Sequence, residues 1–477
     1  MRAGRGDTAT DAVTDAFFTA HLARGAAPAA AWGVFDADGL QQLNSAGAAP
    51  DAAFRIASCT KSFTAAAVLA LRDDGLLGLD DPITRFVPAL NLERLPSPRS
   101  AIPTLRMLLT MSAGLPTDDP WGDRQESLSA DEFDVLLSAG VRFESEPGTR
   151  FAYSNLGYAI LGRVIEAAAG QPYRRVVEQR LLEPLGLVGT GFDQTVSAAG
   201  GIVIGHRRHA GSWEPLPLSG PGAFSPIGGL FSTVADLASW ARWLARAFDT
   251  DAAADDADDA VLSAASRREM QQLHRLDQDV TGHPTGYGFG LFVEQYSPTS
   301  RVISHSGGYP GFSAHMRWSL EHRFGLIAFE SATYSRVSEV TTEAFDALLA
   351  ARERETAATA VSALPLWPET RAAQRSITDI LTAADALAEP LDTALFSENV
   401  ELDQPLARRR SALRLAVADI GGLDGDAVPA AETSEGPAHL VWFIPGQSGR
   451  LRVEIRMTPE ATPRVQTLRI AADRAGR

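Results

Sequence analysis

The chain has 477 residues, of which 45% are hydrophobic and 21% charged, and its formal net charge at pH 7 is -16. This composition is that of a globular protein and excludes a fibrous or wholly disordered chain. The length suits one large domain plus one smaller domain. The negative charge argues against nucleic acid and against an anionic membrane surface as partners, because clustered Lys and Arg bind both.

The chain has almost no lysine. Lysine and arginine together number 43, and since Lys61 is the only lysine, 42 of these are arginines. Arginine can replace lysine in surface salt bridges, but it cannot give up a proton near neutral pH, whereas a buried ammonium can. Lys61 is therefore a candidate for a position where chemistry excludes arginine, and chance survival of a single lysine is the alternative. Cys59 is the sole cysteine, which excludes an intrachain disulfide or a cysteine zinc cluster, and we predict a small buried apolar role for it.

The amino-terminal segment contains acidic residues and has no apolar run of signal-peptide length, and no later segment approaches the length of a membrane span. We therefore expect a cytoplasmic protein that does not enter a membrane.

Within the first 350 residues, strands are predicted near both ends and helices mostly between them. After a first helical stretch, residues 29–36 and 39–47 are predicted as strands, and residues 59–73 and 155–170 as helices. Further along the chain we predict three strands and a helix, at residues 302–308, 313–320, 324–330 and 339–352. A sheet built from both ends, with a mostly helical insert between them, follows from this order. The acidic tract at 249–260 is predicted to be a surface loop.

The composition changes near residue 355, where TAATAVSALPLWPE is typical of a linker. We predict a large domain over residues 1–355 and a small domain over residues 366–477. The small domain is expected to contain helices followed by an antiparallel meander of three strands, at 439–444, 450–457 and 464–470. In the middle strand, apolar residues alternate with charged ones, which predicts one packed face and one polar face.

A serine and a lysine three residues apart open the predicted helix at 59–73. That spacing places the side chains of Ser58 and Lys61 on one face of a helix, within hydrogen-bonding reach of each other. The positive end of a helix favours both a serine alkoxide and a lysine that has lost its proton. The pattern indicates a nucleophilic serine with a lysine base.

Two further motifs carry polar groups that suit the same chemistry. Tyr153 and Asn155 stand immediately before the second long helix, where a tyrosine hydroxyl could shuttle a proton if a positive neighbour lowers its pKa. Asn155 could orient Lys61 or hold a substrate amide. His305, Gly307 and Gly308 end a predicted strand, and glycines there would let a backbone N–H pair with that of Ser58 as an oxyanion hole.

Taken together, the motifs S-x-x-K at 58–61, Y-x-N at 153–155 and H-x-G at 305–307 resemble those of the penicillin-recognising serine hydrolases related to class C β-lactamases. That group includes esterases, D-aminopeptidases and D-amino-acid amidases. The segment GGLFSTVADL at 228–237 is also typical of this group. The resemblance covers roughly the first three quarters of the chain. It implies an α+β fold, with an antiparallel sheet flanked by helices and a helical subdomain.

The resemblance also implies roles for the motif residues. Ser58 would be the nucleophile, and Lys61 and Tyr153 would handle protons. Asn155 and His305 would line the site, and the N–H groups of Ser58 and Gly308 would bind the oxyanion. No cofactor or metal is implied. The expected substrate is a small-molecule or peptide ester or amide.

One departure and three alternatives qualify this prediction. β-Lactamases of this type carry a lysine where His305 stands, and a mostly neutral histidine is a weaker anchor for a carboxylate, which argues against β-lactamase activity. The first alternative is a penicillin-binding-protein-type thioesterase that releases or cyclises a carrier-linked nonribosomal peptide. The candidates for its C-terminal arginine are Arg450, Arg452, Arg456 and Arg464, and a place on a solvated strand face is the alternative for each of them. The second is a non-catalytic ligand-binding homologue, and the third is a metal-dependent hydrolase using His206 and His209, which we expect to be only a surface pair.

Overall fold

The structure is a computed structural model that describes residues 8–193, 196–249, 256–277, 282–297, 300–359, 366–383, 392, 394–424 and 430–474. It divides the chain into two compact units, Met1–Arg352 and Glu353–Arg477. Each unit has a hydrophobic core of its own.

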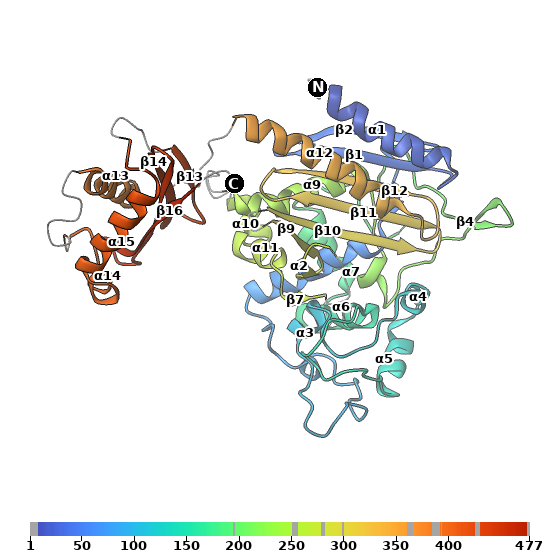
Figure 1. Cartoon of the computed structure of the whole chain (residues 1–477). Helices are drawn as coiled ribbons and strands as arrows, with labels where there is room; N and C mark the ends of the chain where they lie inside the picture. Colours follow the sequence, from blue (N-terminus) through green and yellow to red (C-terminus); the bar gives the residue numbers. More distant parts are fainter. Residues whose placement is uncertain are drawn as a thin grey trace. The chain divides into compact units, whose positions relative to one another are not determined.

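The first unit is built on an eight-stranded sheet in which neighbouring strands pair antiparallel, in the order β2-β1-β12-β11-β10-β9-β8-β7 (Figure 1). The bounds of its strands are β1 Ala30–Asp36, β2 Gly39–Ala46, β7 Arg275–Leu276, β8 Thr285–Tyr287, β9 Phe292–Ser297, β10 Ser300–Tyr309, β11 Phe312–Ser319 and β12 Phe324–Glu330. Because β1 pairs with β12, the sheet joins the two ends of the unit, as predicted.

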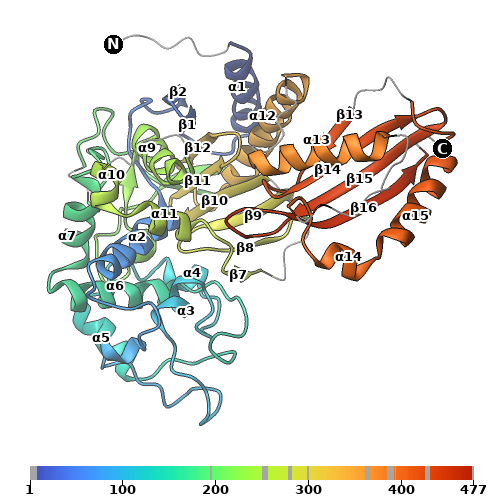
Figure 2. The ribbon, with the colours of Figure 1, turned by 90° about the vertical axis from the view of Figure 1, so that its left-hand side faces the viewer.

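Helices cover both faces of this sheet (Figures 1 and 2). On one face, α1 (Thr8–Ala23) and α12 (Val337–Thr359) bury Phe18, Phe345 and their neighbours against Trp32 of β1 and Phe324 of β12. The opposite face packs in the main core against α2 (Thr60–Asp73), α9 (Val234–Ala245) and α11 (Ala264–Met270). This arrangement confirms the predicted α+β fold with its antiparallel sheet flanked by helices.

In the sequence, a mostly helical region lies between the strands β1 and β2 and the later strands of the sheet. Its longest helix is α6 (Asn155–Ala169), which ends where Gly170 takes a left-handed conformation with φ of 69°, as predicted. The shorter helical elements are η1 Ala57–Cys59, η2 Ile83–Arg85, α3 Leu105–Leu109, α4 Asp119–Gly122, α5 Ala130–Ser138, α7 Tyr173–Val177, η3 Glu178–Leu182, α8 Ser225–Gly228, η4 Arg246–Phe248 and α10 Asp256–Val261. Two small antiparallel pairs, β3 (Phe54–Arg55) with β6 (Phe231–Ser232) and β4 (His206–His209) with β5 (Ser212–Pro215), complete the unit.

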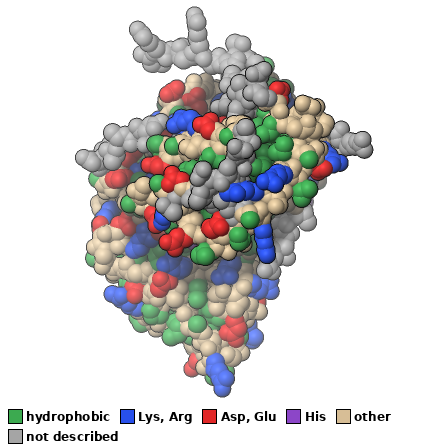
Figure 3. All heavy atoms as spheres, turned by 60° about the vertical axis from the view of Figure 1, so that its left-hand side comes forward, with side chains coloured by type: hydrophobic (Ala, Val, Ile, Leu, Met, Phe, Trp, Pro, Cys, Tyr) green, Lys and Arg blue, Asp and Glu red, His purple; other side chains and the backbone are tan. Residues whose placement is uncertain are grey.

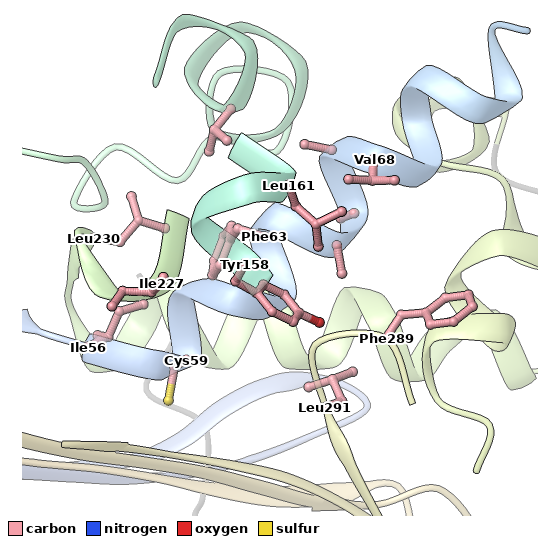
Figure 4. Packing of buried hydrophobic residues seen from close by; sticks show 14 of the residues in the cluster. Ile56, Cys59, Phe63, Val68, Tyr158, Leu161, Ile227, Leu230, Phe289 and Leu291 are labelled. Carbon is pink, nitrogen blue, oxygen red and sulfur yellow. The ribbon is translucent and has the colours of Figure 1, made fainter. Parts of the chain in front are cut away.

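Helix α2 is the central element of the main core. It is rich in alanine, which favours helix and allows close approach of neighbours, and its residues from Thr60 to Leu71 are buried. Figure 4 shows Phe63 of α2 and Tyr158 of α6 among the buried side chains of this core, while Cys59 points towards the sheet. The ring of Phe63 stacks on that of Trp240 in α9, with their centres 3.9 Å apart. A helix buried on all sides is held by packing, so its first turn is fixed in position.

The second unit is a four-stranded antiparallel sheet in the order β13-β14-β15-β16, with strands Ala430–Thr433, His439–Gly446, Gly449–Met457 and Val465–Asp473. Its helices are α13 Pro368–Thr382, α14 Asn399–Asp403 and α15 Leu406–Asp419. In β15, Leu451, Val453, Ile455 and Met457 are buried in the core, which confirms the predicted meander and its packed face. The edge strand β13 was not predicted.

The structure corrects two boundaries. The tract at 249–260 was predicted as a loop, but Asp256–Val261 forms α10, because alanine and a helix-compatible spacing outweigh the acidic composition; residues 250–255 lie outside the described residues. The predicted linker begins four residues too early, since α12 continues to Thr359 through a run of arginine, glutamate and alanine that favours helix. Residues 360–365 also lie outside the described residues.

Acidic and basic side chains are interspersed on the face of the molecule drawn in Figure 3. Of the helices within the described residues, none combines the length and the apolar character needed to cross a membrane.

Candidate active site

Ser58 lies in the 3-10 turn η1, directly ahead of α2. The turn packs against β10 so closely that a Cβ on Gly307 would lie 2.4 Å from the carbonyl oxygen of Ile56 and 3.2 Å from the backbone nitrogen of Ser58. Ala57 has a left-handed φ of 46°, a conformation that costs a residue with a side chain about 1–2 kcal/mol. The strained backbone and the close approach together hold Ser58 at one fixed place beside the end of β10.

Lys61 is fully buried one turn further along, with its ammonium group in contact with three acceptors. The Nζ atom lies 2.9 Å from Ser58 Oγ, 2.7 Å from Asn155 Oδ1 and 3.0 Å from the carbonyl oxygen of Ile227. Burial lowers the pKa of Lys61 to about 8, against the opposing charges of nearby aspartates. A neutral amine is therefore accessible near physiological pH, and its lone pair can accept the proton of Ser58.

Tyr153 is half-buried beside these groups, and its hydroxyl hydrogen-bonds with Ser58. The Lys61 ammonium lies 5.0 Å from the centre of its ring. Even so, burial and the charge of Asp119 hold the pKa of Tyr153 well above its usual value. The condition set from sequence, that a positive neighbour lowers this pKa, is not met, and the hydroxyl keeps its proton.

Two adjacent aspartates hold Asn155 in place at the start of α6. Asp118 accepts the backbone N–H groups of Asn155 and Leu156, at 2.6 and 2.9 Å, and so caps the helix. Asp119 accepts the side-chain amide of Asn155 at 2.8 Å. Burial raises the pKa of Asp118.

His305 is buried and neutral, with both ring nitrogens engaged. Nδ1 lies 2.6 Å from the carbonyl oxygen of Ser306, which can only accept, so Nδ1 carries the proton. Nε2 must then accept from the hydroxyl of Tyr287, at 2.9 Å. Burial, together with the Lys61 charge, lowers the pKa of His305 to about 3. A neutral ring with no spare donor is poorly suited to hold a carboxylate.

The end of β10 presents a backbone N–H towards the site. Tyr309 and Phe312 close a two-residue hairpin and form a hydrogen-bonded pair, so the next pair, Gly308 with Ser313, is not hydrogen-bonded. The N–H of Gly308 therefore points away from β11, and the pairing of β10 with β9 ends at Ser304. Ser58 stands in the first turn of η1, where N–H groups have no partner within the turn. These two N–H groups are the candidate oxyanion donors.

A cavity of about 460 Å³ opens above these residues. Its lining includes Ser58, Tyr153, His305, Gly307 and Gly308, so the structure brings these predicted site residues together; Asn155 lies behind them against Lys61. The charged groups that line the cavity are carboxylates, namely Asp119, Asp123 and Asp277.

Asp123 and Tyr334 form one wall of this cavity. The hydroxyl of Tyr334 donates to Asp123 at 2.7 Å, and Tyr334 itself has a left-handed φ of 46°. Burial raises the pKa of Asp123 to about 7, so its charge changes near neutral pH.

Sequence reasoning missed several residues outside the three motifs. Asp119, Asp123, Phe292 and Tyr334 line the cavity, and Asp118 and Tyr287 contact Asn155 and His305. The run TDDPWGD at 117–123 was the available signal, since three aspartates in one short segment beside a proline and a tryptophan are unusual for a plain surface loop. Tyr287 and Tyr334 gave no such signal.

No group of three or more potential metal ligands occurs within the residues described above. His206 and His209 are the two ends of the short strand β4, where the ring of His209 is exposed.

The β-lactamase family matches residues 14–351 of the chain. The chain belongs to the β-lactamase family. Among curated proteins, penicillin-binding protein 4* of Bacillus subtilis is similar to this chain, with 27% identity over 317 residues, a match that covers 63% of this chain and 64% of that protein. The chain spans 53 to 64% of the length of the first curated relatives it matches.

Solved structures of β-lactamase fold cover more of the chain. The octameric penicillin-binding protein homologue from Pyrococcus abyssi matches with a TM-score of 0.62 at 20% identity, over 96% of this chain and 98% of that one. The D-amino acid amidase from Ochrobactrum anthropi, solved with L-phenylalanine amide, matches with a TM-score of 0.57 at 26% identity, over 72% of this chain and 99% of that one.

Proposed function

We propose that the protein is a serine hydrolase that cleaves an ester or amide through an acyl-enzyme on Ser58. The observation that carries this proposal is the contact of 2.9 Å between Ser58 Oγ and the Nζ of a fully buried Lys61. A buried lysine with a pKa of about 8 is a competent base for a serine at neutral pH.

In acylation, Ser58 loses its proton and forms an ester with the acyl group, while the ester or amide bond of the substrate breaks. As Ser58 Oγ bonds to the carbonyl carbon, its proton passes to neutral Lys61, and the N–H groups of Ser58 and Gly308 stabilise the negative oxygen. Collapse expels the alcohol or amine, which takes the proton from Lys61 by way of the Tyr153 hydroxyl. A water molecule then attacks the acyl-enzyme in the same way and releases the acid. Asn155 keeps Lys61 in place, and His305 shapes the wall.

The charge of the cavity supports an amine-bearing substrate of the amino-acid amide or ester kind. Its carboxylates, Asp119, Asp123 and Asp277, complement a protonated amine, whereas the neutral His305 offers no anchor to the carboxylate of a β-lactam. The similarity to a D-amino acid amidase points in the same direction. We infer a small amino-acyl amide or ester as the substrate, acted on in the cytoplasm.

Two alternatives have less support. For a thioesterase acting on a carrier-linked peptide, the C-terminal arginines should have a free guanidinium for the substrate carboxylate. Each of them instead meets a carboxylate in its own unit, in the pairs Arg450 with Asp473, Arg452 with Glu454, Arg456 with Glu435 and Arg464 with Glu460. A non-catalytic binder has no need for a lysine and a tyrosine arranged around the serine.

A matched pair of substrates tests this proposal. A D-amino acid p-nitroanilide and its N-acetyl derivative differ in the amine charge while they share the scissile bond. We expect kcat/KM for the free amine to exceed that for the acetylated compound by about tenfold or more, the effect of one charge-assisted hydrogen bond. Equal rates would contradict the amine preference, and unchanged turnover by Ser58→Ala would contradict the mechanism. A peptidyl thioester with a free N-terminal amine tests the alternative, which predicts a cyclic product.

A further inference from the structure

A continuous chain of hydrogen bonds leads from the reacting oxygen to a carboxylate that the three motifs do not include. Ser58 Oγ contacts Lys61 Nζ at 2.9 Å, Lys61 Nζ contacts Asn155 Oδ1 at 2.7 Å, and Asn155 Nδ2 contacts Asp119 Oδ1 at 2.8 Å. Asp119 also lines the catalytic cavity.

The orientation of the Asn155 amide decides whether Lys61 is held or repelled. An amide presents an acceptor on one side and a donor on the other, and a half-turn exchanges them. With the oxygen towards Lys61, the amide accepts a proton from the lysine; with the nitrogen towards Lys61, two donors face each other. A carboxylate only accepts, so Asp119 requires the nitrogen on its own side and thereby turns the oxygen towards Lys61.

We propose that Asp119 is a positioning residue for acyl transfer, which fixes the amide of Asn155 and thereby the place and proton affinity of Lys61. The inference rests on the proposed function, since it concerns the lysine that serves Ser58. Asp119 acts through Asn155 and not on the substrate bond.

The neighbouring carboxylates of Asp118 and Asp123 have other hydrogen-bond partners than Asp119. Both oxygens of Asp118 are taken by backbone N–H groups at the start of α6. Asp123 accepts the hydroxyl of Tyr334. Asp119 is the one of the three that contacts the Asn155 side chain.

Asp119 also affects Lys61 through its charge. Of the charges that oppose burial and raise the pKa of Lys61, that of Asp119 has the largest effect. The titratable groups that face Lys61 from the elements around it are Asp118, Asp119 and Asp123 near α4, Cys59 in η1, Tyr153 and Tyr158 at α6, and His305 in β10. Cys59 and the tyrosines have raised pKa values and His305 a lowered one, so they stay neutral. The aspartates supply the charge, and that of Asp123, whose pKa is raised to about 7, changes near neutral pH.

Two substitutions separate position from charge. Asp119→Asn keeps an oxygen that can accept from Asn155 but removes the charge, whereas Asp119→Ala removes both. Asp134→Asn is the matched control, because Asp134 is a surface carboxylate paired with Arg163 on the helical region. The measurement is the second-order rate constant for labelling of Ser58 by a fluorophosphonate between pH 5.5 and 9.5, since this reagent does not titrate in that range. Thermal unfolding of each variant checks the fold.

We expect Asp119→Asn to keep its high-pH labelling rate within about threefold, while the acid limb of the profile moves about one unit towards lower pH, because loss of a nearby negative charge favours neutral lysine. In Asp119→Ala, the labelling rate constant at high pH should fall by about 100-fold, because the lysine base is misplaced. The pH profile of the labelling rate in Asp134→Asn should be the same as that of the wild type.

The inference is overturned if the acid limb of the pH profile does not move in Asp119→Asn, or if Asp119→Ala is labelled at the wild-type rate. In either case, labelling of Ser58 in the wild type still supports the proposed function. Absence of labelling at Ser58 in the wild type overturns the proposed function and this inference with it.

Discussion

Gly307→Ala is expected to impair catalysis through geometry alone. The glycine lies where β10 crosses the turn that carries Ser58, and an added Cβ would stand 2.4 Å from the carbonyl oxygen of Ile56 and 3.0 Å from the Cβ of Ala57. An ordinary contact between these atoms begins near 3.4 Å, so β10 and η1 must separate by about 1 Å. Both contacts are with rigid parts of buried elements, so no flexible side chain can absorb the change.

A separation of that size moves the N–H of Gly308 relative to that of Ser58. Misplacement by about 1 Å costs on the order of 100-fold in rate, so kcat/KM on a p-nitrophenyl ester should fall by about that factor. Gly308→Ala is the matched control, because its Cβ would meet the ring of Tyr334 at 2.7 Å, and that half-exposed side chain can move aside. We expect a loss of less than about tenfold there. Equal activity of Gly307→Ala and wild type, with matching thermal unfolding, would refute the account of the oxyanion site.

Three further predictions follow from the same structure. Lys61→Arg keeps the charge but cannot supply a neutral base, so acylation should fall by about 10²- to 10⁴-fold, and a variant with substantial burst activity would remove Lys61 from proton transfer. Because the pKa of Lys61 is about 8 and its neutral form is the base, the wild-type labelling rate should rise about tenfold from pH 7 to pH 9; a flat profile would contradict this sign. Leu161→Ala, in the buried core, should lower the free energy of unfolding by about 2–5 kcal/mol, whereas the exposed Leu76→Ala should change it by less than about 0.5 kcal/mol in chemical denaturation.

The sequence was sufficient for elements whose signal is local. The spacing of Ser58 and Lys61 predicts side chains one turn apart, and the structure has them in contact. The alternation in β15 and the alanine-rich α2 were likewise readable, because periodicity reports burial directly. The strands β7 and β8 escaped prediction, since they are two and three residues long and lie in a stretch interrupted by Gly286, Gly288 and Gly290.

The environment of the site depends on long-range packing that no single sequence reveals. The carbonyl oxygen of Ser306 sets the tautomer of His305, and the other ring nitrogen accepts from Tyr287, which comes from another strand of the sheet. Asp119 reaches Asn155 across 36 positions of chain because Asp118 caps α6 and holds the two segments together. The condition that a positive neighbour lowers the pKa of Tyr153 is not met for the same reason, since burial in the assembled site and the charge of Asp119 raise that pKa.

The central claim is that Ser58 forms the acyl-enzyme. The most direct measurement is mass spectrometry of the protein after reaction with a fluorophosphonate or an activated p-nitrophenyl ester, followed by mapping of the modified peptide. We predict a single adduct on Ser58, absent in Ser58→Ala. An adduct on any other residue, with Ser58 unmodified, would contradict the mechanism.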